Sequence, residues 1–396
     1  MEGVGSQATT PPLTTHRRSL LALTGIRFFA AFYVVIFHSR VGGSLFERGH
    51  YAAAYFFMSG YLAVPLFFLL SGFILAYTYE GQIEQRGDFR RFWEARFARI
   101  WPVYAISLLL SSVPGLVFPS LGVAVATLCM VQAWNPFNAG MAGAWNFVCW
   151  TLSVEALFYL CFPWLQNWIE RRTLRIQLLV IGLSLLVCVA LNSGSRTLGY
   201  IAEGVFRWIP LPLLHLSEFF TGVGMGNYFL RRSAIAEARL SSRILRGSGT
   251  WTYVSALATV VLLCRAPGRW TSLVVIAFSA LIFGLAAEKT LLSRFLSTRV
   301  MVLGGGISYS IYLMQMPLKF WVSLIFERLG IQSQSLRLVV TALLLIAVSL
   351  LLFKLVEDPA RKLLRAFFSR VEQRRQATAR RRKERLVDSS ASPGGV

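Results

Sequence analysis

An arginine and a histidine in the first long apolar segment, residues 20–38, have the types and spacing for chemistry in an apolar setting. At about 100° per residue, the eleven positions from Arg27 to His38 make roughly three turns. Both side chains therefore share one helix face, about 16 Å apart along the axis. An ionisable group in a membrane span costs at least ~2.5 kcal/mol unless it is paired or faces water. The pair thus indicates a polar channel. The alternative is an interfacial arginine and a histidine that merely ends the helix.

A carboxylate lies near the middle of a later apolar segment, where it would be costly without a partner. Glu155 could orient His38 as a general base or pair with Arg27. The alternative is a structural Glu–Arg pair that only holds two helices together. Tyr159, four residues further on, shares the helix face of Glu155, whereas Ser153 is more typical of packing.

Five arginines precede the third apolar segment, residues 100–118: Arg86, Arg90, Arg91, Arg96 and Arg99. A guanidinium group binds phosphate oxygens in a bidentate manner, so this cluster could hold a polyanionic donor such as a nucleotide. The alternative is an ordinary basic loop of a membrane protein, since such loops are enriched in Lys and Arg on the cytoplasmic side.

The composition is that of a membrane protein. The 396 residues are 55% hydrophobic and 15% charged, and the mean hydropathy is +0.57. The net charge of +22 would suggest a nucleic-acid partner in a soluble protein. Here the arginines crowd between apolar segments, where anionic lipid explains them, so we expect no nucleic-acid partner. The five cysteines have no metal-site or disulfide spacing, and we expect neither a metal nor a cleaved signal peptide.

Charge also predicts the number of crossings. There are eleven apolar segments: 20–39, 61–79, 100–118, 121–134, 145–165, 176–192, 208–229, 251–264, 270–287, 300–325 and 336–356. If all of them crossed, the basic loop 171–175 would lie outside, against the positive-inside rule. Segment 121–134 is the shortest, at a length typical of re-entrant or buried helices. We therefore predict an all-α polytopic protein with about ten transmembrane helices, one short re-entrant or buried helix, and both termini in the cytoplasm.

The chain divides into three parts on this interpretation. Residues 1–19 form a polar N-terminal tail, 20–365 the transmembrane domain, and 366–396 a basic, partly disordered cytoplasmic tail. The segments 40–60, 193–207, 265–269 and 326–335 are expected to be external loops, because they are less basic.

Six segments resemble, in order and spacing, the acyltransferase 3 family of integral membrane O-acyltransferases. They are Arg27-x10-His38, Pro65-Leu-Phe-Phe-Leu-Leu-Ser71-Gly72-Phe73, Arg96-Phe-Ala-Arg99-Ile-Trp-Pro102-Val-Tyr104, Trp150-Thr-Leu-Ser153-Val-Glu155-Ala-Leu-Phe158-Tyr159, Ile307-Ser308-Tyr309-Ser310-Ile311-Tyr312-Leu313 and Glu357-Asp-Pro359-Ala-Arg361.

The resemblance implies transfer of an acyl group, commonly acetyl from acetyl-CoA, to a hydroxyl of a carbohydrate or glycosylated acceptor at the bacterial cytoplasmic membrane. Acyl-CoA is then a co-substrate, and no bound cofactor is expected. An imidazole pKa of about 6.5 suits His38 as general base, with an acyl-His intermediate as the alternative. Glu155 and Arg27 would complete the catalytic group. The donor would bind Arg90, Arg91, Arg96, Arg99 and Tyr104.

Several supporting residues are weaker candidates. Tyr309 and Tyr312 could donate hydrogen bonds to an acyl oxygen, but aromatic stripes at helical spacing are more often core. Gln315 lies where many family members carry histidine, and glutamine cannot titrate. His215 lies where relatives often have arginine, so a permanent charge is lost. Ser153 and Tyr159 complete this group.

Two other function classes fit the same composition. A transporter or flippase for a glycolipid or polar metabolite would also have internal charges, but the sequence lacks the internal repeat that many transporters show. A non-catalytic membrane partner would use its polar residues only to hold helices together, and it should tolerate the loss of His38.

Overall fold

The computed structural model describes residues 20–112, 119–194, 208–238, 249–265 and 270–360, together with six isolated residues (268, 362, 363, 366, 367 and 370). Within these ranges the chain is helical and contains no strand. The elements are α1 (Leu21–His38), α2 (Val41–Glu47), α3 (Tyr51–Met58), η1 (Ser59–Leu62), α4 (Ala63–Thr78), α5 (Arg86–Ser112), α6 (Leu121–Leu128), α7 (Ala139–Ala142), η3 (Phe147–Cys149), α8 (Trp150–Glu170), α9 (Leu174–Gly194), α10 (Leu211–Leu214), α11 (Leu216–Ala238), α12 (Thr250–Leu263), α13 (Thr271–Ala287), α14 (Leu291–Leu296), α15 (Arg299–Arg328), α16 (Gln334–Leu352) and η5, a π-helix (Phe353–Glu357).

The all-helical fold and its apolar helices are those of a multi-pass membrane protein. Among the described residues, five stretches are long and apolar enough to cross a bilayer: Leu21–His38, Tyr51–Thr78, Phe147–Glu170, Leu174–Leu191 and Gln334–Ala360. Two shorter apolar helices, α12 and α13, accompany them. The total of about ten crossings and the cytoplasmic position of both termini stay predictions.

Two segments expected to lie outside the apolar helices are themselves helical. Residues 40–60 form α2, α3 and the start of η1, and their external position stays a prediction. The basic segment 86–99 is the first half of the 27-residue helix α5. Asp88 explains where α5 begins, because its carboxylate accepts hydrogen bonds from the backbone N–H groups of Glu84 and Gln85, 3.2 and 3.0 Å away.

The segment predicted to be re-entrant or buried contains only a short helix. α6 has eight residues, so it rises about 12 Å and cannot by itself cross ~30 Å of hydrocarbon. After α6 the chain turns at Met130, which adopts a left-handed φ of 57°.

Helices α1 and α15 run parallel and touch at backbone level. A Cβ atom placed on Gly305 would lie 1.8 Å from the carbonyl oxygen of Thr24. Further along both helices, His38 contacts Gln315. Only glycine permits this approach, as at the small-residue interfaces of membrane helices. The close contact sets the register of the two helices and therefore brings His38 level with Gln315.

Helices α4 and α11 cross in a similar way. Cβ atoms placed on Gly72 and Gly222 would lie 2.3 Å from the Phe219 carbonyl oxygen and 2.2 Å from the Leu69 carbonyl oxygen, respectively. The crossing packs the aromatic rings of Phe158 and Phe219 into a stack with centroids 4.5 Å apart. This interface supports the α8 face that carries Glu155.

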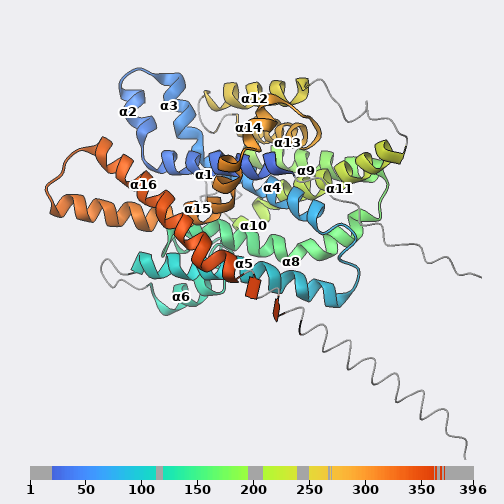
Figure 1. The fold of residues 1–396 in the computed structure, drawn as a ribbon, viewed down its shortest axis with the longest axis horizontal. Coiled ribbons are helices and arrows are strands. Elements are labelled where there is room, and N and C mark those ends of the chain that lie inside the picture. Colours follow the sequence, from blue (N-terminus) through green and yellow to red (C-terminus); the bar gives the residue numbers. More distant parts are fainter. Residues whose placement is uncertain are drawn as a thin grey trace, which may run out of the picture.

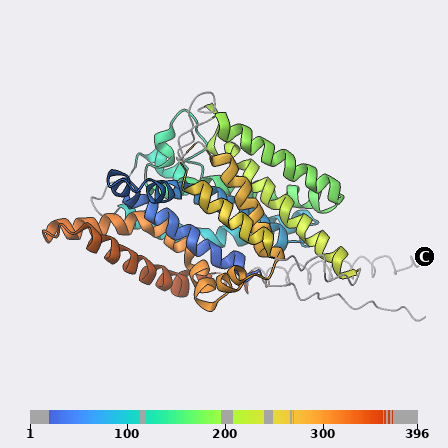
Figure 2. The same ribbon diagram turned by 90° about the horizontal axis from the view of Figure 1, so that it is seen from above.

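Different segments of the chain gather at different places around the bundle. α2 and α3 lie at the same end as the turn between α15 and α16, at the left of both views (Figures 1 and 2). Two hydrogen bonds join the segment after α4, the turn between α8 and α9, and α11. The backbone N–H of Gly81 donates to Glu170, and the Arg231 guanidinium donates to the Arg172 carbonyl. The sidedness of these loops stays a prediction.

Candidate functional site

A small cavity brings together the polar residues predicted on three different helices. It has a volume of about 50 Å³, and its lining includes Arg27 of α1, Glu155 of α8 and Ser308, Tyr309 and Tyr312 of α15. This space is termed the Arg27 cavity below. It holds Arg27 and Glu155 at one site, as one of the alternatives for Glu155 requires.

The environment of Glu155 is rich in positive charge. Tyr159 donates a hydrogen bond to Glu155 Oε2 over 3.1 Å, and Trp93 Nε1 fixes the backbone by donating to the Tyr159 carbonyl over 2.8 Å. Arg27, Arg99 and Arg96 all act electrostatically on the carboxylate. Three cations therefore act on Glu155, and a second carboxylate, Glu357, acts on Arg99, so that one positive charge is left to suit an anionic ligand.

Arg96 and Arg99 point from α5 toward this region. Arg96 Nη2 donates to the Tyr79 hydroxyl over 3.1 Å, and the guanidinium carbon lies 5.4 Å from the centroid of the Tyr79 ring and 5.7 Å from that of Phe92. Arg99 is half-buried and interacts electrostatically with Arg27 and Glu357.

Sequence reasoning left Glu357 out of the site. Its side chain is 1% exposed and lies at the end of the π-helix η5. A π-helix adds one residue to a turn, which rotates the following side chains and often marks functional positions. The sequence feature that could have indicated Glu357 as a site residue was its position: it is an ionisable residue of the Glu357-Asp-Pro359 motif, directly after the last long apolar segment.

The other residues predicted to bind the donor are placed differently. Arg90 and Arg91 lie on the exposed face of α5, with side chains 63% and 51% exposed. They pair with Glu94 and Asp88 at 2.6 and 3.8 Å. Tyr104 is fully buried, and its hydroxyl donates to the Thr127 carbonyl over 2.7 Å. Tyr104 therefore anchors α6 to α5.

His38 lies at the last turn of α1, where Gln315 orients its ring. His38 Nδ1 lies 3.1 Å from Gln315 Oε1, and Gln315 Nε2 donates to the Tyr312 carbonyl over 2.8 Å. Because that second bond uses the amide N–H, the amide oxygen faces the imidazole. Nδ1 then carries the proton in the neutral ring, and Nε2 keeps the lone pair that a general base requires. Gln315, and not Glu155, thus orients the histidine.

A second, larger cavity lies beside His38. It has a volume of about 480 Å³, and its lining includes Ser111, Trp145, Asn146, Phe147, Lys319 and Phe320. Lys319 Nζ donates to the His38 carbonyl, and the ring of Phe147 meets the imidazole edge-on, with centroids 5.8 Å apart. This space is termed the Lys319 cavity. Sequence reasoning missed Lys319, although a lysine inside the apolar segment 300–325 was a signal.

One face of α15 connects the two cavities. Tyr309, Tyr312, Gln315 and Lys319 follow each other at spacings of three or four residues, which places them along one side of the helix over about 15 Å. The two tyrosine hydroxyls are bonded to backbone carbonyls: Tyr309 to Ile100 over 2.7 Å, and Tyr312 to Val148 over 3.4 Å. α15 therefore presents a polar path from the Arg27 cavity to His38.

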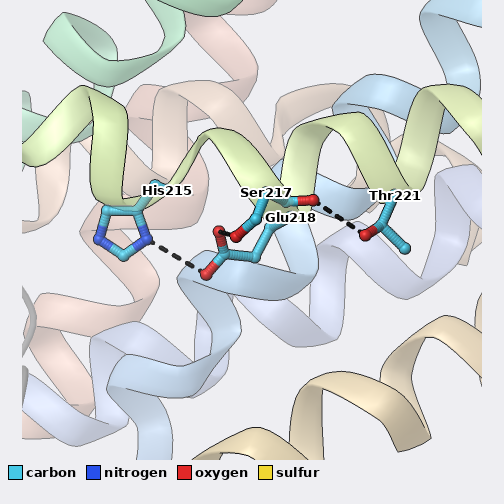
Figure 3. Close-up of polar contacts among 4 residues, drawn as sticks. All are labelled: His215, Ser217, Glu218 and Thr221. Atoms are coloured by element: carbon cyan, nitrogen blue, oxygen red, sulfur yellow. Dashed lines mark hydrogen bonds and ion pairs between the residues drawn. The ribbon is translucent and has the colours of Figure 1, made fainter. Parts of the chain in front are cut away.

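His215 forms a separate buried pair behind the Arg27 cavity. Its Nδ1 lies 3.4 Å from Glu218 Oε1, and Ser217 donates to the other carboxylate oxygen over 3.2 Å (Figure 3). The imidazole packs against Phe68, with ring centroids 5.2 Å apart, and Phe68 in turn lines the Arg27 cavity. Since His215 interrupts the helix between α10 and α11, this pair positions the start of α11.

Ser153 is a packing residue in the structure. It is fully buried, and its hydroxyl accepts a hydrogen bond from the Ala133 N–H over 3.1 Å. Trp134 Nε1 donates to the Ser153 carbonyl over 3.1 Å. These bonds hold the chain after α6 against α8. No group of three His, Cys, Asp or Glu side chains that could hold a metal ion occurs in the described part of the chain.

Comparison with known proteins gives a consistent result. Residues 20–354 match the acyltransferase domain that defines the acyltransferase 3 family. Acyltransferase MdmB of Streptomyces mycarofaciens is 34% identical over 158 residues, which are 36% of this chain and 38% of that protein. O-acetyltransferase OatA of Staphylococcus aureus (strain COL) is 23% identical over 374 residues, or 87% of this chain and 58% of that protein.

Protein 2 in the picA locus of Rhizobium radiobacter is 38% identical over 91 residues, which are 23% of this chain and 42% of that protein. The chain thus spans less than two thirds of the length of these curated relatives. No solved structure matches it. The family match covers most of the chain and includes both cavities up to residue 354, and the chain therefore belongs to the acyltransferase 3 family.

Proposed function

We propose that the protein is a membrane O-acyltransferase that moves an acyl group, in the simplest case acetyl, from acyl-CoA to a hydroxyl of a carbohydrate or glycosylated acceptor. The single observation that carries this proposal is the polar face of α15. It joins the Arg27 cavity, where three arginines act electrostatically on Glu155, to an imidazole whose tautomer is set by Gln315. The relative OatA is an O-acetyltransferase by name, which supports acetyl as the group transferred.

The donor would enter at the arginine side. Coenzyme A carries phosphates, which guanidinium groups bind through paired hydrogen bonds. Arg96 and Arg99 are the preferred phosphate ligands, because both face the charged region around Glu155. Arg90 and Arg91 are exposed and paired with neighbouring carboxylates, so they are assigned at most a part in the first encounter. On the predicted topology, this side faces the bacterial cytoplasm.

Transfer would occur beside His38. The acceptor oxygen attacks the thioester carbonyl carbon while His38 Nε2 takes the hydroxyl proton. The C–S bond then breaks, and the proton passes to the departing thiolate to give free coenzyme A. An alternative in which Nε2 itself accepts the acyl group first uses the same lone pair. In either route the thioester must reach His38 along α15, which accounts for a donor site and a base on one helix face.

The experiment compares the wild-type protein with His38→Ala and His50→Ala in lipid nanodiscs. His50 is exposed in the segment between α2 and α3, so His50→Ala is a matched control. Acetyl-CoA turnover is measured with a panel of glycoside acceptors, and acetyl-CoA binding is measured separately. We expect His38→Ala to bind acetyl-CoA but transfer nothing, and His50→Ala to behave as wild type.

Two results would contradict the proposal. Normal transfer by His38→Ala would remove the proposed role of the imidazole. Folded wild-type protein that neither binds nor consumes acetyl-CoA would favour the transporter interpretation, which requires substrate movement without thioester cleavage.

A further inference from the structure

We propose that the Lys319 cavity is the acceptor site and that it takes a neutral ring compound with hydroxyl groups and one apolar face, such as an uncharged glycoside. This inference rests on the proposed function, because it assigns the second substrate of the same reaction. It follows from the position, the charge and the lining of the cavity.

The cavity lies close to the base, because two of its lining residues contact His38. Phe147 lines the cavity and packs edge-on against the His38 imidazole. Lys319 lines it as well, and its ammonium group donates to the His38 carbonyl. A ligand in contact with Phe147 and Lys319 is therefore one side chain away from the imidazole.

The charge of the lining separates the two substrates. The Lys319 cavity has one cation, Lys319, and one carboxylate, Glu327, so its formal charge is zero. The Lys319 ammonium is also engaged with the His38 carbonyl. The charged residues that line the Arg27 cavity are Arg27 and Glu155, and two further arginines, Arg96 and Arg99, act electrostatically on Glu155. Arg96 and Arg99 favour a polyanion near the Arg27 cavity, whereas the balanced charge of the lining of the Lys319 cavity suits a neutral molecule.

The size and surface of the cavity fit a sugar-sized ring with an apolar side. A volume of about 480 Å³ lies within the range of roughly 300–1,000 Å³ that is usual for small-molecule sites. Trp145, Phe147 and Phe320 supply flat apolar faces. The indole of Trp145 is held in place because its Nε1 donates to Ser112 Oγ over 2.7 Å.

The polar groups of the cavity suit hydroxyls. Asn146 is 3% exposed, and its Nδ2 donates to the Leu313 carbonyl over 3.1 Å, while Oδ1 is buried with no hydrogen-bond partner. An unpaired buried acceptor is costly, and a ligand hydroxyl could satisfy it. Ser111 and Ser323 add two hydroxyl groups to the same lining. Neutral donors and acceptors around apolar faces are the pattern expected for a polyol.

The test uses two probes that differ only at C6, where p-nitrophenyl β-glucoside has a neutral hydroxymethyl group and p-nitrophenyl β-glucuronide has a carboxylate. The protein is the full chain in lipid nanodiscs, because alkyl maltoside detergents are themselves glycosides and would compete. Equilibrium binding of each probe is measured without acetyl-CoA, and acetyl-CoA binding and transfer are measured in parallel.

The variants are Ser323→Trp, which fills the cavity, and Asn146→Leu, which removes the unpaired acceptor. Ser335→Trp is the matched control, since Ser335 is exposed at the start of α16. For Ser323→Trp we expect loss of glucoside binding and unchanged acetyl-CoA binding. For Asn146→Leu the Kd for the glucoside should rise roughly tenfold, which equals about 1.4 kcal/mol for a lost hydrogen bond. Wild type should bind the glucoside more tightly than the glucuronide.

The outcomes separate this inference from the proposed function. Glucoside binding by Ser323→Trp with the wild-type Kd, tighter wild-type binding of the glucuronide, or no glucoside binding by wild type would each overturn the inference. Loss of glucoside binding in Ser323→Trp supports the site even if acetyl-CoA is never consumed. In that case only the proposed acyl transfer fails.

Discussion

The contact between α1 and α15 leads to a sharp prediction about two adjacent glycines. A Cβ atom on Gly305 would lie 1.8 Å from the Thr24 carbonyl oxygen, whereas one on Gly306 would lie 3.7 Å from its nearest neighbours, the ring carbons of Phe353. Gly305→Ala should therefore damage the protein, and Gly306→Ala should be accommodated. Both variants add the same methyl group to the same helix.

The magnitude follows from the geometry. Ordinary contact begins near 3.4 Å, so Gly305→Ala requires α1 and α15 to separate by about 1.6 Å. Overpacking of this kind usually costs about 1–3 kcal/mol. A shift of that size would also lengthen the 3.1 Å contact between His38 and Gln315 beyond hydrogen-bond range. A misplacement of about 1 Å in a catalytic group can lower the rate about 100-fold.

In Gly306→Ala the added methyl makes an ordinary van der Waals contact with the Phe353 ring, and replacing a helical glycine by alanine gains up to about 1 kcal/mol. The assay is thermal inactivation of each variant in nanodiscs, combined with acetyl transfer at a temperature where both are folded. We expect Gly305→Ala to unfold at a lower temperature and to transfer about 100-fold more slowly. Gly306→Ala should match or exceed wild type in stability.

Equal behaviour of the two variants would refute the reasoning, because it would mean that α1 and α15 are not in backbone contact at Gly305. Gly305→Ala with wild-type stability but slow transfer would show that the helices separate at little cost. The close approach would then be needed only to align His38.

Three further predictions concern single side chains. Gln315→Leu should lower kcat roughly 10- to 100-fold, about 1.4–3 kcal/mol for a lost orienting bond, with acetyl-CoA binding unchanged by calorimetry; a wild-type kcat would show that the imidazole does not need this partner. Glu218→Leu should lower the free energy of unfolding by about 1–3 kcal/mol because buried His215 loses its partner. The added change His215→Phe should restore part of that loss in thermal unfolding, and no restoration would contradict the pairing. Arg99→Gln should raise the KM for acetyl-CoA about tenfold, whereas Arg90→Gln, at an exposed surface pair, should change it by about twofold or less; equal effects would argue against a donor site around Glu155.

The sequence by itself determined the class of the protein and much of its layout. The composition and the length of the apolar segments predicted an all-helical membrane protein, because a bilayer leaves few ways to satisfy backbone hydrogen bonds. The placement of basic residues singled out segment 121–134, where the structure has only an eight-residue helix. The motifs from Arg27 to Pro359 indicated the acyltransferase 3 family, and the family match confirms this.

Local spacing also predicted some neighbours correctly. Tyr159, four residues after Glu155, bonds to it because both lie on one helix face. The same logic could not choose a partner for Glu155 on another helix. The partner depends on which helices pack together. In the structure Glu155 shares the Arg27 cavity with Arg27.

Only the tertiary structure decided the surroundings of His38. Gln315 lies 277 residues away in the chain and becomes its partner because glycine lets α1 and α15 approach at Gly305. The Lys319 cavity is formed by α5, the segment before α8, and α15, so no single segment carries its pattern. Helix periodicity specifies which face of its helix a residue occupies. Contacts between the faces of different helices depend on how helices that are distant in the sequence pack together. The surroundings of His38 consist of such contacts, so only the tertiary structure could show them.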